Sequence, residues 1–180
     1  MTEEKTNPNK ESIEEFLESF RMASERKRLG LLNGLEERVE ELHSLGANLM
    51  SGFDPSICDW TPGFILQLIH KTDDNFIKNT LNCNDLAWFL APSDVGFDYS
   101  PLQRYLLNES YEDADRFTSS KLRELAGEKA VKRGYVYFSE VDSIPGIDLS
   151  TLNKLWIVYS RGKFGFTVQS KILESVGGRY

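Results

Sequence analysis

Apolar residues recur at helical spacing in the N-terminal part of the chain and predict two amphipathic helices. The first is expected over residues 10–28, where Ser12 and Glu15 form a capping-box pattern at the start and Gly30 follows the end. The second is expected over residues 31–45, and we interpret its acidic face as solvated rather than as a partner surface. The apolar positions are Ile13, Phe16, Leu17 and Phe20 in the first helix and Leu32, Leu35, Val39 and Leu42 in the second.

Shorter helices are predicted in the middle of the chain, between segments rich in Gly, Pro and Asp. Gly46 occupies the position that ends a helix in a left-handed conformation. Thr61 followed by Pro62 is a typical helix start, so a helix is expected over residues 62–70. The other helices expected in this part cover residues 74–81 and 85–90.

A connector rich in Pro, Gly and Asp covers residues 91–100 and predicts a domain boundary. Ser100 and Pro101 then open a new helix, because a cap residue followed by proline favours a helix start. Ser110 and Gly127 bracket the next helix, which is expected over residues 111–126, and residues 129–134 form a small basic connector.

The densest apolar and aromatic stretch, residues 148–173, is compatible with two structures. A hairpin would pair two runs rich in β-branched and aromatic residues around residues 160–163. Alternatively, two helices would meet at Gly162, with Asp148 as the N-cap of the first. The buried stripe of that first helix would be Leu152, Leu155, Trp156 and Tyr159.

Charge argues against nucleic-acid binding by the N-terminal half. The net charge is −7, and residues 1–96 carry 9 Lys or Arg against 17 Asp or Glu. Residues 97–180 carry 12 against 11, so this half could accept an anionic small molecule without strong repulsion. No apolar run approaches the roughly 20 residues that span a bilayer, and the acidic N-terminus does not have the pattern of a signal peptide.

No motif of enzymatic chemistry is present. The sequence has no Walker A loop, GxGxxG or GxSxG motif, and its two Cys and two His lack the spacing of a zinc site. We therefore expect no catalytic residue and no metal site. The aromatic residues after position 134 are compatible with a plain core, which spacing alone favours, or with an apolar cleft for a flat ligand.

Residues 97–171 resemble the genomes-uncoupled-four family, whose members are porphyrin-binding regulators of magnesium chelatase. The resemblance rests on many short motifs that occur in the order and spacing typical of the family. These motifs are DYSPLQ at 98–103, AD at 114–115, KLRELAG at 121–127, YFSEV at 137–141, IP at 144–145, DLSTL at 148–152, LW at 155–156, YS at 159–160 and GKFGFTVQ at 162–169.

The resemblance implies an all-α, non-catalytic protein that holds protoporphyrin IX or Mg-protoporphyrin IX in an open apolar cleft. It further implies stimulation of magnesium chelatase through the large porphyrin-binding subunit of that enzyme, and it favours the two-helix interpretation of residues 148–173. Phe138 and Val141 inherit the family's porphyrin-facing positions. The full set of candidate porphyrin-binding residues is Phe138, Val141, Ile144, Trp156 and Arg133.

The expected organisation is a disordered tail at residues 1–9, an N-terminal helical bundle or HEAT-like extension at 10–91, and a porphyrin-binding core at 97–180. Because members of the family continue past the equivalent of residues 177–180, the core resembles a C-terminally shortened member. We expect a monomer in the cyanobacterial cytoplasm or the chloroplast stroma, with peripheral membrane association as an option.

Overall fold

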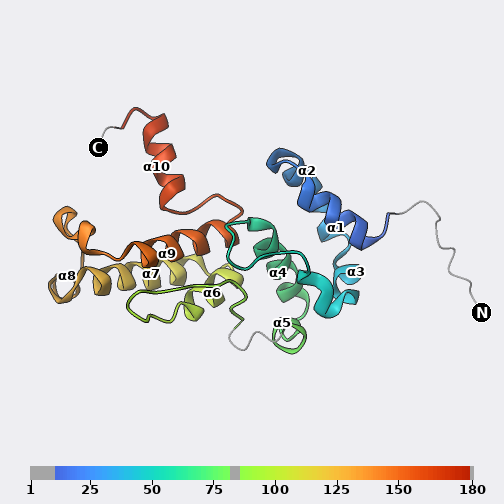
Figure 1. Ribbon diagram of the computed structural model, residues 1–180, viewed down its shortest axis with the longest axis horizontal. Helices are drawn as coiled ribbons and strands as arrows, with labels where there is room; N and C mark the ends of the chain where they lie inside the picture. Colours follow the sequence, from blue (N-terminus) through green and yellow to red (C-terminus); the bar gives the residue numbers. More distant parts are fainter. Residues whose placement is uncertain (1–10, 82–85, 179–180) are drawn as a thin grey trace, which may run out of the picture. The chain divides into compact units, whose positions relative to one another are not determined.

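The computed structural model describes residues 11–81 and 86–178, and these residues form helices and loops without a strand. The expected all-α class is therefore confirmed. The chain divides into two compact units, Met1–Leu49 and Met50–Tyr180, which are described separately below (Figure 1). The tail expected at residues 1–9 lies outside the described residues.

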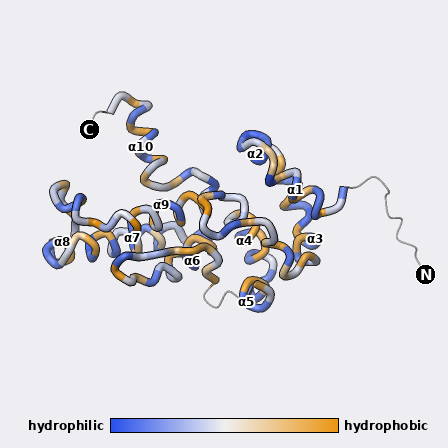
Figure 2. Tube along the Cα trace, viewed as in Figure 1, coloured by the Kyte–Doolittle hydropathy of each residue, from blue (hydrophilic) through white to orange (hydrophobic). Residues whose placement is uncertain are grey.

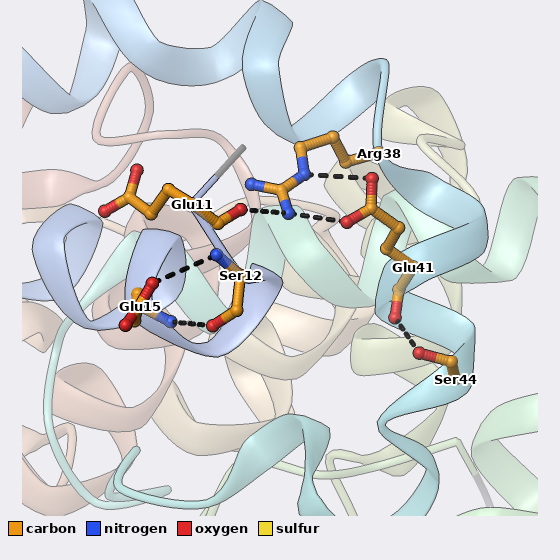
Figure 3. Close-up of polar contacts among 6 residues, drawn as sticks. All are labelled: Glu11, Ser12, Glu15, Arg38, Glu41 and Ser44. Carbon is orange, nitrogen blue, oxygen red and sulfur yellow. Dashed lines mark hydrogen bonds and ion pairs between the residues drawn. The ribbon is translucent and has the colours of Figure 1, made fainter. Parts of the chain in front are cut away.

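The described residues of unit 1, from residue 11 onward, form three short helices. The predicted capping box is confirmed, because the Glu15 amide donates to Ser12 Oγ and the Ser12 amide donates to the Glu15 carboxylate, each at 3.1 Å (Figure 3). Gly46, with a φ of +53°, also follows the last helix as predicted. The helices are α1 (Ile13–Met22), α2 (Glu25–Glu36) and α3 (Val39–Ser44), followed by the 3₁₀ turn η1 (Gly46–Met50).

The predicted single helix over residues 10–28 is wrong, because the chain breaks at Ala23 and Ser24, both of which are extended. The guanidinium of Arg28 stabilises the break by donating to the carbonyl oxygens of Ala23 (3.1 Å) and Arg21 (2.5 Å) at the end of α1. Gly30 lies inside α2 and ends no helix. The predicted second helix is also split, since α2 ends before α3 begins.

Arg38 ties the start of α3 to Glu11, the residue before the N-cap of α1 (Figure 3). Its guanidinium makes two contacts with the Glu41 carboxylate, at 3.1 and 2.5 Å, and donates to the Glu11 carbonyl at 3.0 Å. Arg38 is only 9% exposed, so these bonds satisfy a cation that burial would otherwise destabilise.

Unit 2 is built around the pair α4 and α9. Figure 2 shows hydrophobic residues recurring along both helices. The two backbones approach closely at Gly63, where a Cβ would lie 2.2 Å from the carbonyl oxygen of Val158. The helices of this unit are α4 (Trp60–Thr72), α5 (Phe76–Thr80), α6 (Ser100–Leu107), α7 (Tyr111–Ala126), α8 (Glu128–Arg133), the 3₁₀ helix η2 (Phe138–Ser143), α9 (Gly146–Tyr159) and α10 (Phe166–Ser175).

In unit 2, most of the predicted helices begin within two residues of the position that the sequence indicates. α7 has the predicted bounds. α4 begins at Trp60 because its N-cap is Asp59 rather than Thr61: the Asp59 carboxylate accepts a hydrogen bond from the Thr61 amide. The basic connector over residues 129–134 is in fact helical: it forms most of α8, which ends at Gly134 with a φ of +90°. α5 covers only part of the predicted 74–81 helix.

The helix predicted over residues 85–90 is wrong for its described part, since residues 86–90 are not helical. The side chain of Gln103, on α6, supplies the hydrogen bonds that the backbone of Phe89 would otherwise make within a helix. It accepts from the Phe89 amide at 3.0 Å and donates to the Phe89 carbonyl at 2.8 Å. A buried amide from another helix thus satisfies this backbone in an irregular conformation.

The two-helix interpretation of residues 148–173 is correct, and Gly162 lies in the connection with a φ of +72°. Asp148, however, is not the N-cap, because α9 begins at Gly146 after Pro145. The Asp148 carboxylate is instead buried and holds the preceding connector. It accepts hydrogen bonds from Ser93 Oγ at 2.5 Å, the Tyr99 hydroxyl at 2.7 Å and the Asp94 amide at 3.0 Å.

These contacts bear on where the chain divides. The sequence predicts a boundary at residues 91–100, whereas the observed division lies between Leu49 and Met50. α4 lies on the C-terminal side of that division because it packs against α6 and α9. The connector itself is joined to α9 by Asp148 and by the Thr151 hydroxyl, which donates to the Pro92 carbonyl at 2.7 Å.

Candidate functional site

An open apolar cleft of about 490 Å³ lies in unit 2 between α7, the segment 136–144, α9 and the start of α10. Its size and apolar character are those of small-molecule sites, in which a few polar groups set the orientation of the ligand. The lining residues are Leu122, Val136, Val141, Ile144, Leu149 and Phe166, together with the polar Ser150, Asn153 and Thr167.

The short helix η2 forms one wall of the cleft. Val141 lines the cleft although 43% of its surface is exposed, and Ile144, which is 8% exposed, lines it from the end of the same turn. Phe138, on the preceding turn, is 93% exposed and does not line the cleft. The structure therefore brings Val141 and Ile144 together in the cleft, whereas Phe138, three residues before Val141, projects into solvent.

Arg133 is engaged with η2 and does not line the cleft. Its Nη2 donates to the Glu140 carboxylate at 2.5 Å and to the Tyr135 carbonyl at 2.9 Å, and its guanidinium lies 3.7 Å from the ring centroid of Tyr137. The same carboxylate accepts the Tyr137 amide at 2.8 Å. That backbone bond, followed by Arg133, holds the pKa of the Glu140 carboxyl below its ordinary value.

Trp156 lines a second, smaller pocket of about 260 Å³ next to the cleft. Its indole donates to Thr118 Oγ1 at 3.0 Å, and its ring lies 6.3 Å from Tyr111 and 6.0 Å from Phe164. Burial raises the pKa of the Tyr111 hydroxyl. Phe166 lines both pockets, so the two adjoin at that side chain.

The joint between α9 and α10 positions Phe166. Asn153 Oδ1 accepts from both the amide and the hydroxyl of Thr167, at 3.1 and 3.2 Å, and so takes the role of a cap for α10. Gly165 has a φ of +133°, and a Cβ there would lie 2.9 Å from Asn153 Oδ1. Only glycine fits this joint without a shift.

Several lining residues were not among the sequence candidates. Leu122 is apolar and lies on α7, but helical spacing alone does not show that it faces a cleft. The roles of Asn153 and Thr167 depend on how α10 turns back towards α9, and no local pattern indicates that turn. Among the described residues there is no cluster of three potential metal ligands, and no described helix is long and apolar enough to span a membrane.

Unit 2 is thus a small all-α scaffold with an open apolar cleft, and comparison with known proteins places it in a family. A family model described as GUN4-like matches residues 92–180. The Ycf53-like protein of Synechocystis sp. is 32% identical over 172 residues, which is 94% of this chain and 74% of that protein. The chain belongs to the GUN4-like family.

Other relatives match over shorter lengths. The chloroplastic tetrapyrrole-binding protein of Arabidopsis thaliana is 46% identical over 74 residues, which cover 41% of this chain but only 28% of that protein. The structure of GUN4 from Chlamydomonas reinhardtii shares 40% identity and covers 51% of this chain and 62% of that one, with a TM-score of 0.48.

Proposed function

We propose that the cleft binds a flat apolar tetrapyrrole, protoporphyrin IX or Mg-protoporphyrin IX, without performing chemistry on it. The observation that carries the proposal is the cleft of about 490 Å³, which is lined by apolar side chains and bordered by exposed ones. Burying a macrocycle face against such a wall gains roughly 25 cal/mol for each Å² of apolar surface removed from water. The tetrapyrrole-binding name of the Arabidopsis relative supports the same ligand class.

The proposed ligand site comprises Val141 and Ile144 in the cleft wall, Phe138 at its rim, and Trp156 in the adjoining pocket. The exposed apolar side chains of Phe138 and Val141 favour this role, because surface apolar patches mark binding sites more often than isolated residues do. A macrocycle that covers the cleft would place its edge against Phe138.

Porphyrin titration tests the proposal. We expect a shift of the porphyrin absorption band and quenching of tryptophan fluorescence at micromolar ligand in the unsubstituted protein. Phe138→Asp should abolish both signals and leave the helical circular dichroism unchanged, because the Phe138 side chain makes little contact with the core. Ile57→Asp, at another exposed apolar position (56% exposed), introduces the same charge and should bind normally.

Absence of binding by the unsubstituted protein would contradict the proposal. Loss of helical structure in Phe138→Asp would instead show that Phe138 belongs to the core. Equal loss in both variants would show that added negative charge, rather than the rim of the cleft, controls binding.

We propose further that the porphyrin-bound protein stimulates magnesium chelatase, through the large porphyrin-binding subunit of that enzyme, in the cyanobacterial cytoplasm or the chloroplast stroma. Family membership supports this step. Adding the protein to a chelatase assay should raise the rate of magnesium insertion, and Phe138→Asp should remove the increase if the effect depends on the bound porphyrin.

The alternative is a helical interaction module that needs no ligand. The exposed apolar residues of α10, Ile172 (56%) and Val176 (73%), favour it. Under this alternative Ile172→Asp should remove the stimulation while Phe138→Asp retains it. The opposite pattern supports the tetrapyrrole site.

A further inference from the structure

The segment that carries Phe138 and Val141 contacts α7 through η2, but most of its large apolar side chains are exposed. Tyr135, Tyr137, Phe138 and Val141 are all more than 40% exposed, so burial of these side chains does little to hold residues 135–141. Polar contacts therefore contribute to holding this wall of the cleft.

Arg133 and Glu140 provide those contacts. The Glu140 carboxylate accepts hydrogen bonds from both the Arg133 guanidinium and the Tyr137 amide. These bonds link the end of α8 to the start of η2. The guanidinium lies over the rings of Tyr137 (3.7 Å) and Tyr135 (4.8 Å), and the two rings meet edge to face at 5.3 Å. Arg133 is thus stacked, ion-paired and bonded to one backbone carbonyl.

The positive charge of Arg133 is therefore already paired within the protein. Its side chain is 20% exposed and that of Glu140 is 21% exposed, so the pair is partly shielded from solvent. The Nε of Arg133 has no acceptor among the described residues, but it is buried and out of reach of a ligand in the cleft. The described lining of the cleft includes no Lys or Arg.

We propose that Arg133 is a positioning residue, which fixes the wall formed by residues 136–141 through Glu140, rather than a cation that pairs with the carboxylates of the ligand. The cleft then recognises the apolar macrocycle and leaves the ligand's acidic groups to Ser150, Asn153, Thr167 or water. This inference rests on the proposed tetrapyrrole site.

The two roles predict opposite effects when Glu140 is removed. Glu140→Ala breaks the pair and releases Arg133. If Arg133 positions the wall, Glu140→Ala and Arg133→Ala should both raise the Kd of protoporphyrin IX, by roughly tenfold each, because each removes the same charge-assisted contact. If Arg133 paired with ligand carboxylates, Glu140→Ala would free it and lower the Kd.

The ligand provides a second, independent comparison. Protoporphyrin IX dimethyl ester has the same macrocycle without the acidic groups. A positioning role predicts that Arg133→Ala weakens the diacid and the diester by the same factor. A loss confined to the diacid, or tighter diacid binding by Glu140→Ala, overturns the proposal.

Lys132→Ala is the matched control. Lys132 is adjacent and 79% exposed, and it forms a long 3.6 Å ion pair with Glu128, so its removal subtracts the same charge without touching the wall. It should leave both Kd values unchanged. Arg133→Lys keeps the charge but loses the planar stacked fork, and it should behave like Arg133→Ala. Retention of full affinity by Arg133→Lys or by Arg133→Ala would also count against the proposal.

Hydrogen exchange of the Tyr137 amide separates this inference from the proposed function. That amide is bonded to Glu140 in the ligand-free protein, so Arg133→Ala should speed its exchange severalfold and Lys132→Ala should not. If the unsubstituted protein binds no porphyrin, the proposed function fails, and this exchange measurement still decides whether Arg133 holds the wall. Unchanged exchange in Arg133→Ala would show that it does not.

Discussion

Two segments of unit 2 that are rich in large apolar residues lie in opposite environments. In residues 152–159 the side chains of Leu152, Leu155 and Val158 are fully buried. In residues 135–141 the large apolar side chains are exposed, up to 93% at Phe138. The first segment belongs to α9, which packs against α4 and α6, while the second follows Gly134 and contacts α7 through η2 without burying these side chains.

The difference shows that apolar content alone does not separate a core from a binding wall. Both segments satisfy the composition of a core, and spacing alone favoured that interpretation for both. What separates them is how much of the side chains is buried: in α9 they are covered by α4 and α6, whereas in residues 135–141 most large apolar side chains stay exposed although η2 contacts α7. Substitutions in the two segments should therefore act on different quantities, stability in the first and ligand binding in the second.

The largest expected effect is that of Asp148→Ala, at the buried start of α9. The change removes three hydrogen bonds and leaves the Tyr99 hydroxyl and the Asp94 amide without an acceptor, which we expect to lower the free energy of unfolding by about 4 kcal/mol. Chemical denaturation measures it. Asp142→Ala, at an exposed carboxylate, should cost less than about 0.5 kcal/mol.

The same carboxylate makes stability depend on acid. Burial raises the pKa of the Asp148 carboxyl, but hydrogen bonds from Ser93, Tyr99 and the backbone outweigh it, so the pKa lies below its ordinary value. A depressed pKa contributes stability above the unfolded value of about 4, and this is lost as the pH falls through the folded value. Stability of Asp148→Ala should therefore decline less between pH 5 and 2 (roughly the range over which such a carboxyl titrates), and an equally steep decline would contradict this role.

Gly63→Ala should have the next largest effect, because it acts on the contact that buries α9. The added Cβ would lie 2.2 Å from the Val158 carbonyl oxygen, which belongs to the backbone and cannot rotate away. We expect a loss of about 3 kcal/mol in unit 2. Gly30→Ala, at an exposed α2 position with no atom within 4 Å, should instead stabilise unit 1 by about 0.5–1 kcal/mol.

Much of the fold follows from local signals in the sequence. The capping box at Ser12 and the Ser110 and Gly127 bounds of α7 depend on residues within one or two turns, and the structure has them as predicted. Two exceptions share a cause. Gln103 and Asp148 each satisfy a segment that is distant in the sequence, so the irregular residues 86–90 and the start of α9 could not be predicted from local pattern. The break after α1 depends on Arg28, whose side chain turns back to carbonyls five and seven residues earlier, and helical periodicity does not indicate that contact.

The candidate site, like the fold, can be predicted only in part from the sequence. Family resemblance points to Val141 and Ile144, which line the cleft, whereas the ion pair of Arg133 depends on Glu140, seven residues away across a turn. A basic residue near an apolar segment looks available to a ligand in the sequence, and only the conformation after Gly134 shows that its charge is already paired.

Phe138→Ala should have the smallest effect on stability and is the most direct test of the contrast between the two segments. Because the side chain is 93% exposed, its removal should change the free energy of unfolding by less than about 0.5 kcal/mol. Leu152→Ala, the matched truncation in α9, should cost about 2–5 kcal/mol because it leaves a cavity in the core. Porphyrin affinity should fall in Phe138→Ala and remain in folded Leu152→Ala. A stability loss above about 1 kcal/mol in Phe138→Ala would mean that residues 135–141 pack as a core in solution, and the distinction between core and binding wall would no longer hold.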